Sequence, residues 1–140
     1  MPLNRTPLTG NQIVAMANVS LQRNYTLTGD DSNDPTAQTI YSIVNEINVL
    51  GLPSLTYWVR LNSAVGGIVF TPMFAVQNTT VGGVTVPNWL PFTNGAVLVP
   101  GNVFTFFVRS AVANAAVEFT IGPTNPATTI NVDVVITAGG

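Results

Sequence analysis

The chain has 140 residues, of which 46% are hydrophobic and only 7% are charged, with a formal net charge of −2. An average soluble domain carries roughly 25% charged residues, so neutral polar groups must hydrate this surface. Four positive charges, all of them arginines, cannot make a phosphate-binding surface, which argues against nucleic-acid binding. The lack of cysteine excludes a disulfide framework and cysteine-based zinc sites.

No run of roughly 18 apolar residues occurs, so no membrane-spanning segment is expected. Residues 1–10 lack the apolar core of a signal peptide, and we expect a soluble protein made in the cytoplasm. The length is that of one ordinary domain, and residues 1–140 are expected to form a single domain with its own core.

In chain order, residues 1–11 contain Pro2 and Pro7 and little periodicity, which predicts an extended N-terminal arm. Loose alternation over residues 13–27 predicts a first strand, and the polar residues 29–35 are expected to form a loop. Residues 39–50 fit helical spacing as well as a strand, but their β-branched and aromatic side chains favour a strand.

Residues 55–61 and 68–77 are predicted strands, joined by a glycine-containing hairpin turn at residues 63–67. Pro72, in the middle of the second strand, indicates an edge position or a bulge. Residues 78–83 are expected to turn the chain, and residues 84–86 and 97–99 to form short strands. Residues 89–92 are expected to lie across an open end of the fold.

The last forty residues predict three consecutive strands, a meander on which the rest of the chain packs. In the third strand, alternate residues from Ile130 to Ile136 are apolar and fall on one face. Residues 117–121 alternate in the same way, whereas residues 104–108 are apolar on both faces, as in a strand covered on both sides. Strands about every ten residues predict an all-β antiparallel sandwich, and eight or nine strands would suit a jelly roll.

No set of residues amounts to a catalytic motif. With no histidine and no lysine, a serine or threonine nucleophile has only carboxylates as a base. Glu118 and Asp133 lie on adjacent predicted strands, where a carboxylate pair would suit glycosidase chemistry, but surface charges are the simpler interpretation. Asp30, Asp31 and Asp34 resemble the start of a calcium loop that lacks its glycine and distant glutamate. We therefore expect a non-enzymatic protein without metal or cofactor.

Two kinds of residue indicate contacts with partners. Arg60 and Arg109 lie mid-strand, where they either pair with Glu118 or Glu46 or face another subunit, since arginine is enriched at interfaces. A neutral, Asn- and Thr-rich surface also favours close neighbours, because no long charged side chain must be desolvated. The candidate interface residues are Arg60, Arg109, Trp89 and, in the arm, Pro2, Leu3, Pro7 and Leu8.

Trp58 and Trp89, together with Tyr57, are the candidates for a sugar-stacking platform. Packing in the core or at an interface is the simpler interpretation of these tryptophans, because they usually close the ends of a small sandwich.

A cysteine-free, charge-poor sandwich with a Pro-containing arm, whose last strand ends in Val134-Val-Ile-Thr-Ala-Gly-Gly140, resembles the small virion proteins of tailed bacteriophages. The resemblance is to decoration (cement) proteins and head-fibre bases. It covers the whole chain but carries no diagnostic motif, so no functional residue is transferred. It implies a structural role on the outer capsid surface of the virion, with many copies, often trimers, bridging major capsid subunits. The alternative is a carbohydrate- or receptor-binding module of a phage fibre or surface appendage.

Overall fold

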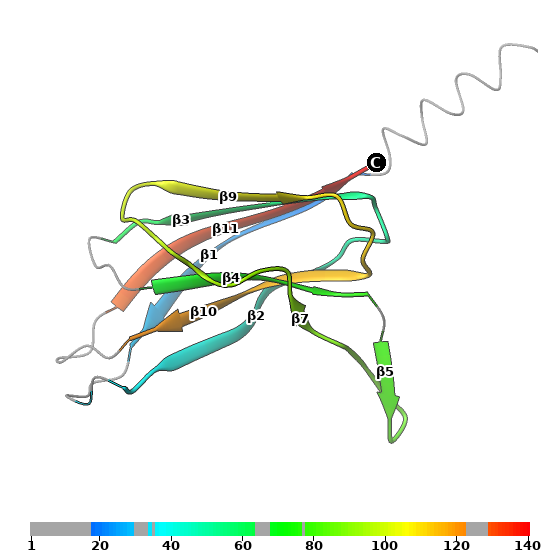
Figure 1. Cartoon of the computed structure of the whole chain (residues 1–140), viewed down its shortest axis with the longest axis horizontal. Coiled ribbons are helices and arrows are strands. Elements are labelled where there is room, and N and C mark those ends of the chain that lie inside the picture. The colour runs from blue at the N-terminus through cyan, green and yellow to red at the C-terminus, as the bar shows by residue number, and fades with distance from the viewer. Residues whose placement is uncertain (1–17, 30–33, 35, 64–67, 77, 123–128) are drawn as a thin grey trace, which may run out of the picture.

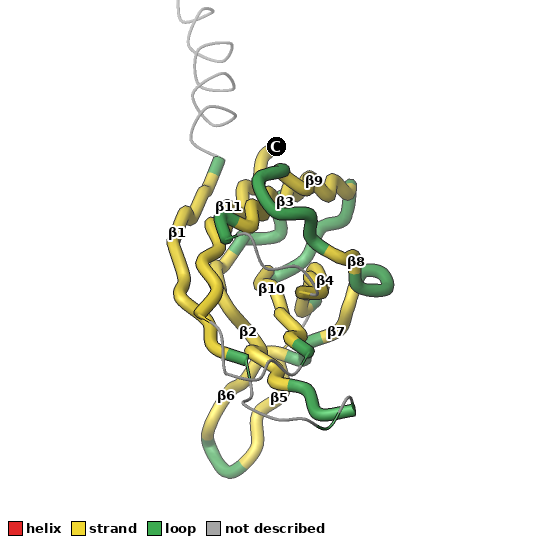
Figure 2. Tube along the Cα trace, turned by 90° about the vertical axis from the view of Figure 1, so that its left-hand side faces the viewer, coloured by secondary structure: helices red, strands yellow, loops and turns green. Residues whose placement is uncertain are grey.

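The computed structural model describes residues 18–29, 34, 36–63, 68–76, 78–122 and 129–140. They form two antiparallel sheets packed face to face, with a small separate hairpin (Figures 1 and 2). The predicted antiparallel sandwich is confirmed. A helix long and apolar enough to cross a membrane is absent from these residues. The predicted arm at residues 1–11 lies outside the described part of the chain.

The strands divide between the sheets in a regular way. The first sheet has the order β1 (Val19–Thr28), β11 (Thr129–Gly139), β3 (Ser54–Leu61), β9 (Val103–Val108). The second has the order β2 (Thr39–Asn48), β10 (Asn114–Ile121), β4 (Ile68–Ala75), β7 (Leu90–Pro91), and β8 (Ala96–Val97) also pairs with β4. The remaining strands, β5 (Asn78–Val81) and β6 (Val84–Pro87), pair with each other.

This order is that of a jelly roll. β7 and β8 lie against the side of β4 that β10 leaves free, so the two short strands occupy one position. With the hairpin set aside, the first sheet then holds the first, eighth, third and sixth strands of the chain. The second sheet holds the second, seventh, fourth and fifth strands. Eight strands in two such sheets make a jelly roll, as the strand spacing predicted.

The predicted meander of the last three strands is wrong. β9 pairs with β3, β10 pairs with β2 and β4, and β11 pairs with β1 and β3, so none of the three pairs with another. Alternation in a sequence tells which face of a strand is buried, but not which strand lies beside it. Each of these strands crosses to the opposite sheet, and both sheets bury one face.

The inner face predicted for the last strand is confirmed. The alternating apolar residues assigned to this face point into the space between the sheets, as do those of β10, and all of them are buried, whereas Val135 lies on the outer face. These side chains are Ile130, Val132, Val134 and Ile136 of β11 and Val117, Phe119 and Ile121 of β10.

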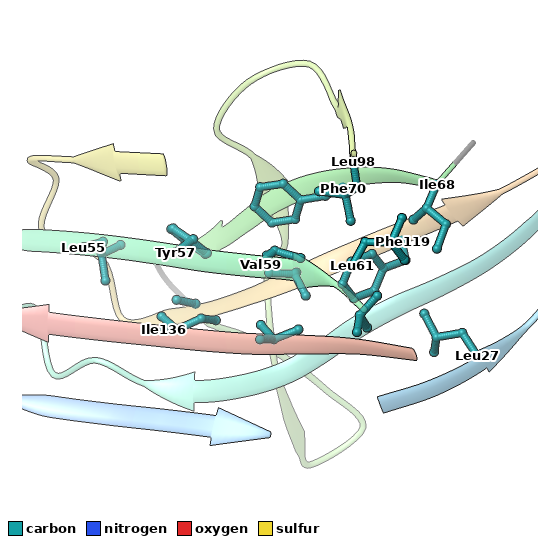
Figure 3. Packing of buried hydrophobic residues seen from close by; sticks show 14 of the residues in the cluster. Leu27, Leu55, Tyr57, Val59, Leu61, Ile68, Phe70, Leu98, Phe119 and Ile136 are labelled. Atoms are coloured by element: carbon teal, nitrogen blue, oxygen red, sulfur yellow. The ribbon is translucent and has the colours of Figure 1, made fainter. Parts of the chain in front are cut away.

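Tyr57 is one of the side chains buried between the two sheets (Figure 3), and three aromatic rings surround it. Its ring centroid is 5.9 Å from that of Phe106, 6.2 Å from that of Phe92 and 6.5 Å from that of Phe70. Its hydroxyl donates a hydrogen bond to the main-chain oxygen of Met73 on the opposite sheet, at 2.9 Å. Burial raises the pKa of Tyr57 far above its ordinary value, so the phenol stays protonated and can donate.

Polar side chains join the two sheets along the edge formed by β1 and β2. The Tyr41 hydroxyl donates to the main-chain oxygen of Thr28 at 2.9 Å and accepts from its main-chain nitrogen at 3.0 Å. The buried amide of Asn45 donates to the Leu21 oxygen at 3.1 Å and accepts from the Tyr25 hydroxyl at 3.3 Å. The bonds of Asn45 satisfy a buried polar side chain, whereas those of Tyr41 join the two strands at the surface.

The strand predicted for residues 39–50 is therefore confirmed as β2. Asn45, which lies inside this run and counts against a helix, has a φ of 59° and lies where the register between β2 and β10 shifts. Asparagine tolerates this left-handed conformation better than most residues, so it suits a bulge.

The fifth strand of the jelly roll is formed by residues 90–97 and is interrupted, because only its two ends, β7 and β8, pair with β4. Leu90–Pro91 pairs with β4, so the expectation that residues 89–92 only cross an open end is wrong. Pro72 is buried in β4, and its main-chain oxygen accepts from the Phe92 nitrogen at 2.9 Å. The side of β4 on which a donor is missing therefore faces the gap between β7 and β8, whereas the register of β4 with β10 runs through Pro72 without a shift. At Gly95 a Cβ atom would come within 2.3 Å of Val69, so only glycine fits there.

The core assignment predicts the effect of a single charge. Replacing Val132, which is fully buried, by Asp places an unpaired carboxylate in an apolar layer. We expect a loss of several kcal/mol, comparable with the whole stability of about 5–15 kcal/mol of a typical domain. Urea unfolding followed by circular dichroism measures this loss. Gln22→Asp, at an exposed position of β1 at the other edge of the same sheet, is the control and should unfold like the parent; a V132D protein as stable as that control would contradict the assigned register.

Candidate interaction surface

A hairpin of two strands, residues 78–87, projects from the sandwich. β5 and β6 pair only with each other, and Gly82 and Gly83 make the turn between them. The φ angles of these glycines are 58° and 81°, the left-handed values of the two-residue turn that Gly-Gly favours. In both views the hairpin extends beyond the second sheet, on the side away from the first sheet (Figures 1 and 2).

The hairpin has one apolar and one polar face. Val81 pairs with Val84, and Val86 lies on the same face two residues further along; they are 70%, 62% and 48% exposed. On the other face Thr80 pairs with Thr85, and their hydroxyl oxygens are 2.9 Å apart. An apolar face on a strand normally packs against a core, but these three valines face solvent in the single chain. We call Val81, Val84 and Val86 the valine face.

Sequence reasoning missed this hairpin. Residues 78–83 were expected only to turn the chain, whereas residues 78–81 form β5 and the turn itself needs only two glycines. The signal was present as Val-Gly-Gly-Val, two β-branched runs on either side of a Gly-Gly pair.

Exposed apolar side chains concentrate in a part of the chain that has no charge. Residues 61–108 contain no Asp, Glu, Lys or Arg. Of the large hydrophobic side chains that the described residues expose, all but Ile40, Leu50 and Trp58 lie in this stretch. Exposed apolar residues scattered singly are ordinary, but a charge-free stretch that presents so many is typical of an interaction surface.

A second apolar surface lies on the outer face of the first sheet, and we call Trp58, Val103 and Phe107 the β9 strip. Trp58 lies opposite Thr105, so Val103 and Phe107 are its diagonal neighbours. Trp58 is 37% exposed, and Val103 and Phe107 are each 56% exposed. The predicted cover on both faces of residues 104–108 is wrong for the single chain, because only the inner face packs on the core. The inner residues are Phe104, Phe106 and Val108.

Asp133, also on the outer face of the first sheet, is the centre of a polar network. Its carboxylate accepts from the amide of Asn24 at 2.7 Å and from the amide of Asn62 at 2.9 Å. Asn131 accepts from the same two amides, each at 2.8 Å. These donors, and then the nearby positive charge of Arg60, lower the pKa of Asp133 below its ordinary value. This end of the sheet is therefore polar, unlike the β9 strip.

The two candidate interface arginines lie on this same outer face. Arg60 is exposed and pairs in register with Asp133 on one side and with Val103 on the other. Its acidic neighbour is therefore Asp133, and not Glu118 or Glu46. Arg109 is exposed and lies just after β9, so its predicted mid-strand position is wrong, and within the described residues no ion pair involves it. Both guanidinium groups flank the β9 strip.

An open groove of about 510 Å³ lies beside Phe107 and Arg109. Ser54 and Ser110 also line it, and Ser54 borders a second, smaller hollow of about 360 Å³ towards β1. The Ser54 hydroxyl donates to the main-chain oxygen of Gly139 at 3.0 Å, so its oxygen remains able to accept. The groove thus combines a cation, an aromatic ring and a hydroxyl acceptor.

The carboxylates do not form a catalytic or metal site in the described residues. Glu118 lies on β10 and Asp133 on β11, in opposite sheets, and both side chains point outwards, so the pairing expected of adjacent strands is wrong. The hydroxyl of Ser42 donates to Glu118 at 3.2 Å.

Asp34, of the candidate calcium loop, accepts from the main chain and hydroxyl of Thr36, as in an ordinary turn, and these bonds lower its pKa. Asp30 and Asp31 lie outside the described residues. Nowhere in the described part do three or more acidic side chains gather where they could hold a metal ion.

The aromatic residues of the candidate glycan platform are distributed over different surfaces. Trp58 lies on the outer face of β3, Trp89 is half-buried just before β7 of the other sheet, and Tyr57 is buried in the core. Trp58 therefore shares its face with Phe107 and not with Trp89. The arm residues Pro2, Leu3, Pro7 and Leu8 lie outside the described part of the chain.

Comparison with known proteins finds likeness in structure only. No family model and no curated protein matches the sequence. A subunit of the disulfide-linked pili of Bacillus endospore appendages is similar over 87% of this chain and 88% of its own, at 15% identity and a TM-score of 0.40. The decameric BFDV capsid protein is similar over 86% and 95%, at 10% identity and 0.39. The Yersinia pseudotuberculosis-derived mitogen is similar over 86% and 87%, at 12% identity and 0.45. At these identities the likeness concerns the fold alone.

The polar network predicts how Asp133 titrates. Replacing Asn62 by Ala removes one of its two amide donors, so the pKa of Asp133 should rise towards 3.8. Carbon-detected NMR titration of the carboxyl group measures this rise. Because the folded pKa is lowered, the bonds stabilise the fold above the unfolded pKa and lose this effect as the pH falls through the folded value. The stability difference between N62A and the parent should therefore be larger at pH 7 than in acid. An unchanged pKa in N62A, with Asn88→Ala as the exposed control, would contradict the assigned donors.

Proposed function

We propose that this protein is a non-enzymatic structural subunit that works by subunit–subunit contacts and decorates the outer surface of a virion capsid. The observation that carries the proposal is the projecting hairpin, whose apolar face is bare in the single chain. An isolated two-stranded hairpin is at best marginally stable in water, and its apolar face gains stability when another surface covers it. The described residues of the sandwich offer this hairpin no such cover.

The scarcity of charge supports assembly in the same way. A surface of Asn, Thr, Ser and Gly can approach another surface closely, because little charge has to be desolvated or paired. The net charge of −2 gives weak repulsion between copies. Both properties suit a protein that is present at high local concentration beside copies of itself.

The place of the protein in a virion, and a major capsid protein as its partner, are supported by the composition it shares with small virion proteins. A homo-oligomer such as a trimer, and contacts of the arm through Pro2, Leu3, Pro7 and Leu8, belong to the same proposal. The jelly roll does not select among functions, because it occurs in capsid proteins, lectins and cupins alike.

The proposal predicts the effect of changing the valine face. Substituting Thr at Val81, Val84 and Val86 keeps side-chain shape and strand propensity but makes the face polar. Each change replaces a methyl group, whose burial contributes about 0.8 kcal/mol, by a hydroxyl that must also lose its hydration. The triple change should therefore weaken a contact made by this face by roughly 3 kcal/mol, on the order of a hundredfold in affinity. Analytical ultracentrifugation over a concentration series, with and without capsids, measures this loss.

The control for that experiment is Ile40→Thr, which makes the same kind of change at an exposed residue of β2. It should assemble like the parent. Unfolding curves of all variants should coincide, because the hairpin lies outside the core. If the triple variant assembled and bound capsids like the parent, the valine face would not be the contact surface. A parent chain that stays monomeric and binds no particle would overturn the proposed function.

A saccharide-binding module is the second candidate, and the groove beside Phe107 and Arg109 is the observation that favours it. An aromatic ring can pack against the C–H face of a sugar, and an unpaired guanidinium can donate two hydrogen bonds to a carboxylate. Such a groove would suit an acidic sugar. Trp58 adds a second ring on the same sheet face.

A glycan array separates the two candidates. We expect the parent protein to bind no glycan on it, since the outer face serves contacts between proteins. Binding to acidic glycans that the change Arg109→Gln abolishes and the change Arg23→Gln leaves intact would instead put the saccharide-binding function ahead. Arg23 is exposed on β1, at the opposite edge of the sheet, and serves as the matched control.

A further inference from the structure

We propose that the valine face of one copy docks on the β9 strip of the next copy, so that the chain assembles head to tail. This inference rests on the proposed function and names its partner: a second copy of this chain. The two surfaces are different and lie on different strands, which makes the contact heterologous rather than a symmetric pairing of two identical surfaces.

The first argument is chemical. The valine face presents three branched aliphatic side chains, and the β9 strip presents Val103 with the rings of Trp58 and Phe107. In the β9 strip two large rings lie beside the smaller side chain of Val103, and the branched valines can pack into this uneven surface. Neither surface carries a charge that docking would have to desolvate. The two arginines that flank the strip, Arg60 and Arg109, stay at its rim.

The second argument is the sequence pattern of β9. The inner residues Phe104, Phe106 and Val108 are all apolar, and on the outer face Val103 and Phe107 are apolar on either side of Thr105, which favours cover on both sides. Among the described residues only the inner face is covered, and Phe107 on the outer face is more than half exposed. β9 is also the last strand of its sheet, so a narrow hairpin can lie across it from the edge.

The third argument is placement. The β9 strip lies on the outer face of the first sheet, whereas the hairpin projects beyond the second sheet (Figures 1 and 2). The thickness of the sandwich, with sheets about 10 Å apart, separates them. One copy therefore cannot cover its own strip with its own hairpin. Each copy has one donor surface and one acceptor surface on opposite sides, and this arrangement propagates from copy to copy.

Two variants make the contact testable. The hairpin variant carries Val81→Thr, Val84→Thr and Val86→Thr, and the strip variant carries Val103→Thr and Phe107→Thr. All five residues are largely exposed, so both variants should unfold like the parent. We expect each variant alone to sediment as a single chain at concentrations where the parent and the Ile40→Thr control are associated.

Mixing the two variants is the decisive measurement. The hairpin variant keeps an intact strip, and the strip variant keeps an intact hairpin, so an equimolar mixture retains one good contact. It should form complexes of one chain of each kind and nothing larger. In such a pair, the two surfaces that stay free are the altered hairpin of one chain and the altered strip of the other. Mass photometry or sedimentation equilibrium shows the two-chain species.

Cross-linking tests the same contact by a second route. The chain has no cysteine, so introduced cysteines are the only thiols. A protein with Val84→Cys mixed with one carrying Phe107→Cys should give a disulfide-linked pair of unlike chains under mild oxidation. The Phe107→Cys protein mixed with an Ile40→Cys protein is the control and should cross-link at least tenfold less.

The outcomes separate this inference from the proposed function. If the parent associates and only the hairpin variant loses association, the valine faces meet each other or another surface, and the head-to-tail contact is overturned while the proposed function stands. The inference also fails if the mixture contains only single chains although both variants are folded. A parent that does not self-associate overturns the head-to-tail contact, and the proposed function falls with it only if that parent also binds no capsid.

Discussion

The contact between the inner faces of the two sheets is the interaction on which the rest of the molecule depends. Tyr57 shows how it is made: its ring packs among phenylalanines of both sheets, and its hydroxyl bonds to the main chain of β4. Because this core uses only inward-pointing residues, the outer faces are free to vary without loss of the fold. The hairpin of β5 and β6 is freer still, since it lies outside both sheets.

The distribution of charge follows from that freedom. The acids and arginines of the described residues lie outside residues 61–108, and Asp133 shows how a charge is held on the first sheet, by two asparagine amides. The charge-free stretch forms the hairpin, β7, β8 and β9, where apolar side chains reach the surface. A monomer gains nothing from exposing them, because each loses the stabilisation that burial would give. An assembled subunit regains it, so the unusual composition of the whole chain is concentrated where contacts with other copies are proposed.

The sequence predicted which faces are buried better than which strands are neighbours. Alternation identified Val132 and Val134 as core residues, because the period of two is a local property of a strand. It could not show that β9, β10 and β11 cross between sheets, since pairing depends on contacts far apart in the chain. For the surface, it placed Arg60 and Arg109 on strands but could not show that they share one face. Residues 104–108 differ from the other strands, because their sequence predicted cover on both faces and the outer face is exposed in the single chain.

That missing cover connects the fold to the form of the assembly. A head-to-tail contact between unlike surfaces closes into a ring when the rotation from copy to copy divides a full turn, and otherwise continues as a filament. The trimer implied by the resemblance to decoration proteins corresponds to a rotation of about 120° per contact. A fibre would use the same valine face and the same β9 strip at another angle. The apolar surfaces therefore set how strongly copies associate, whereas the angle at which the hairpin leaves the second sheet sets whether the assembly is a closed ring or an extended fibre.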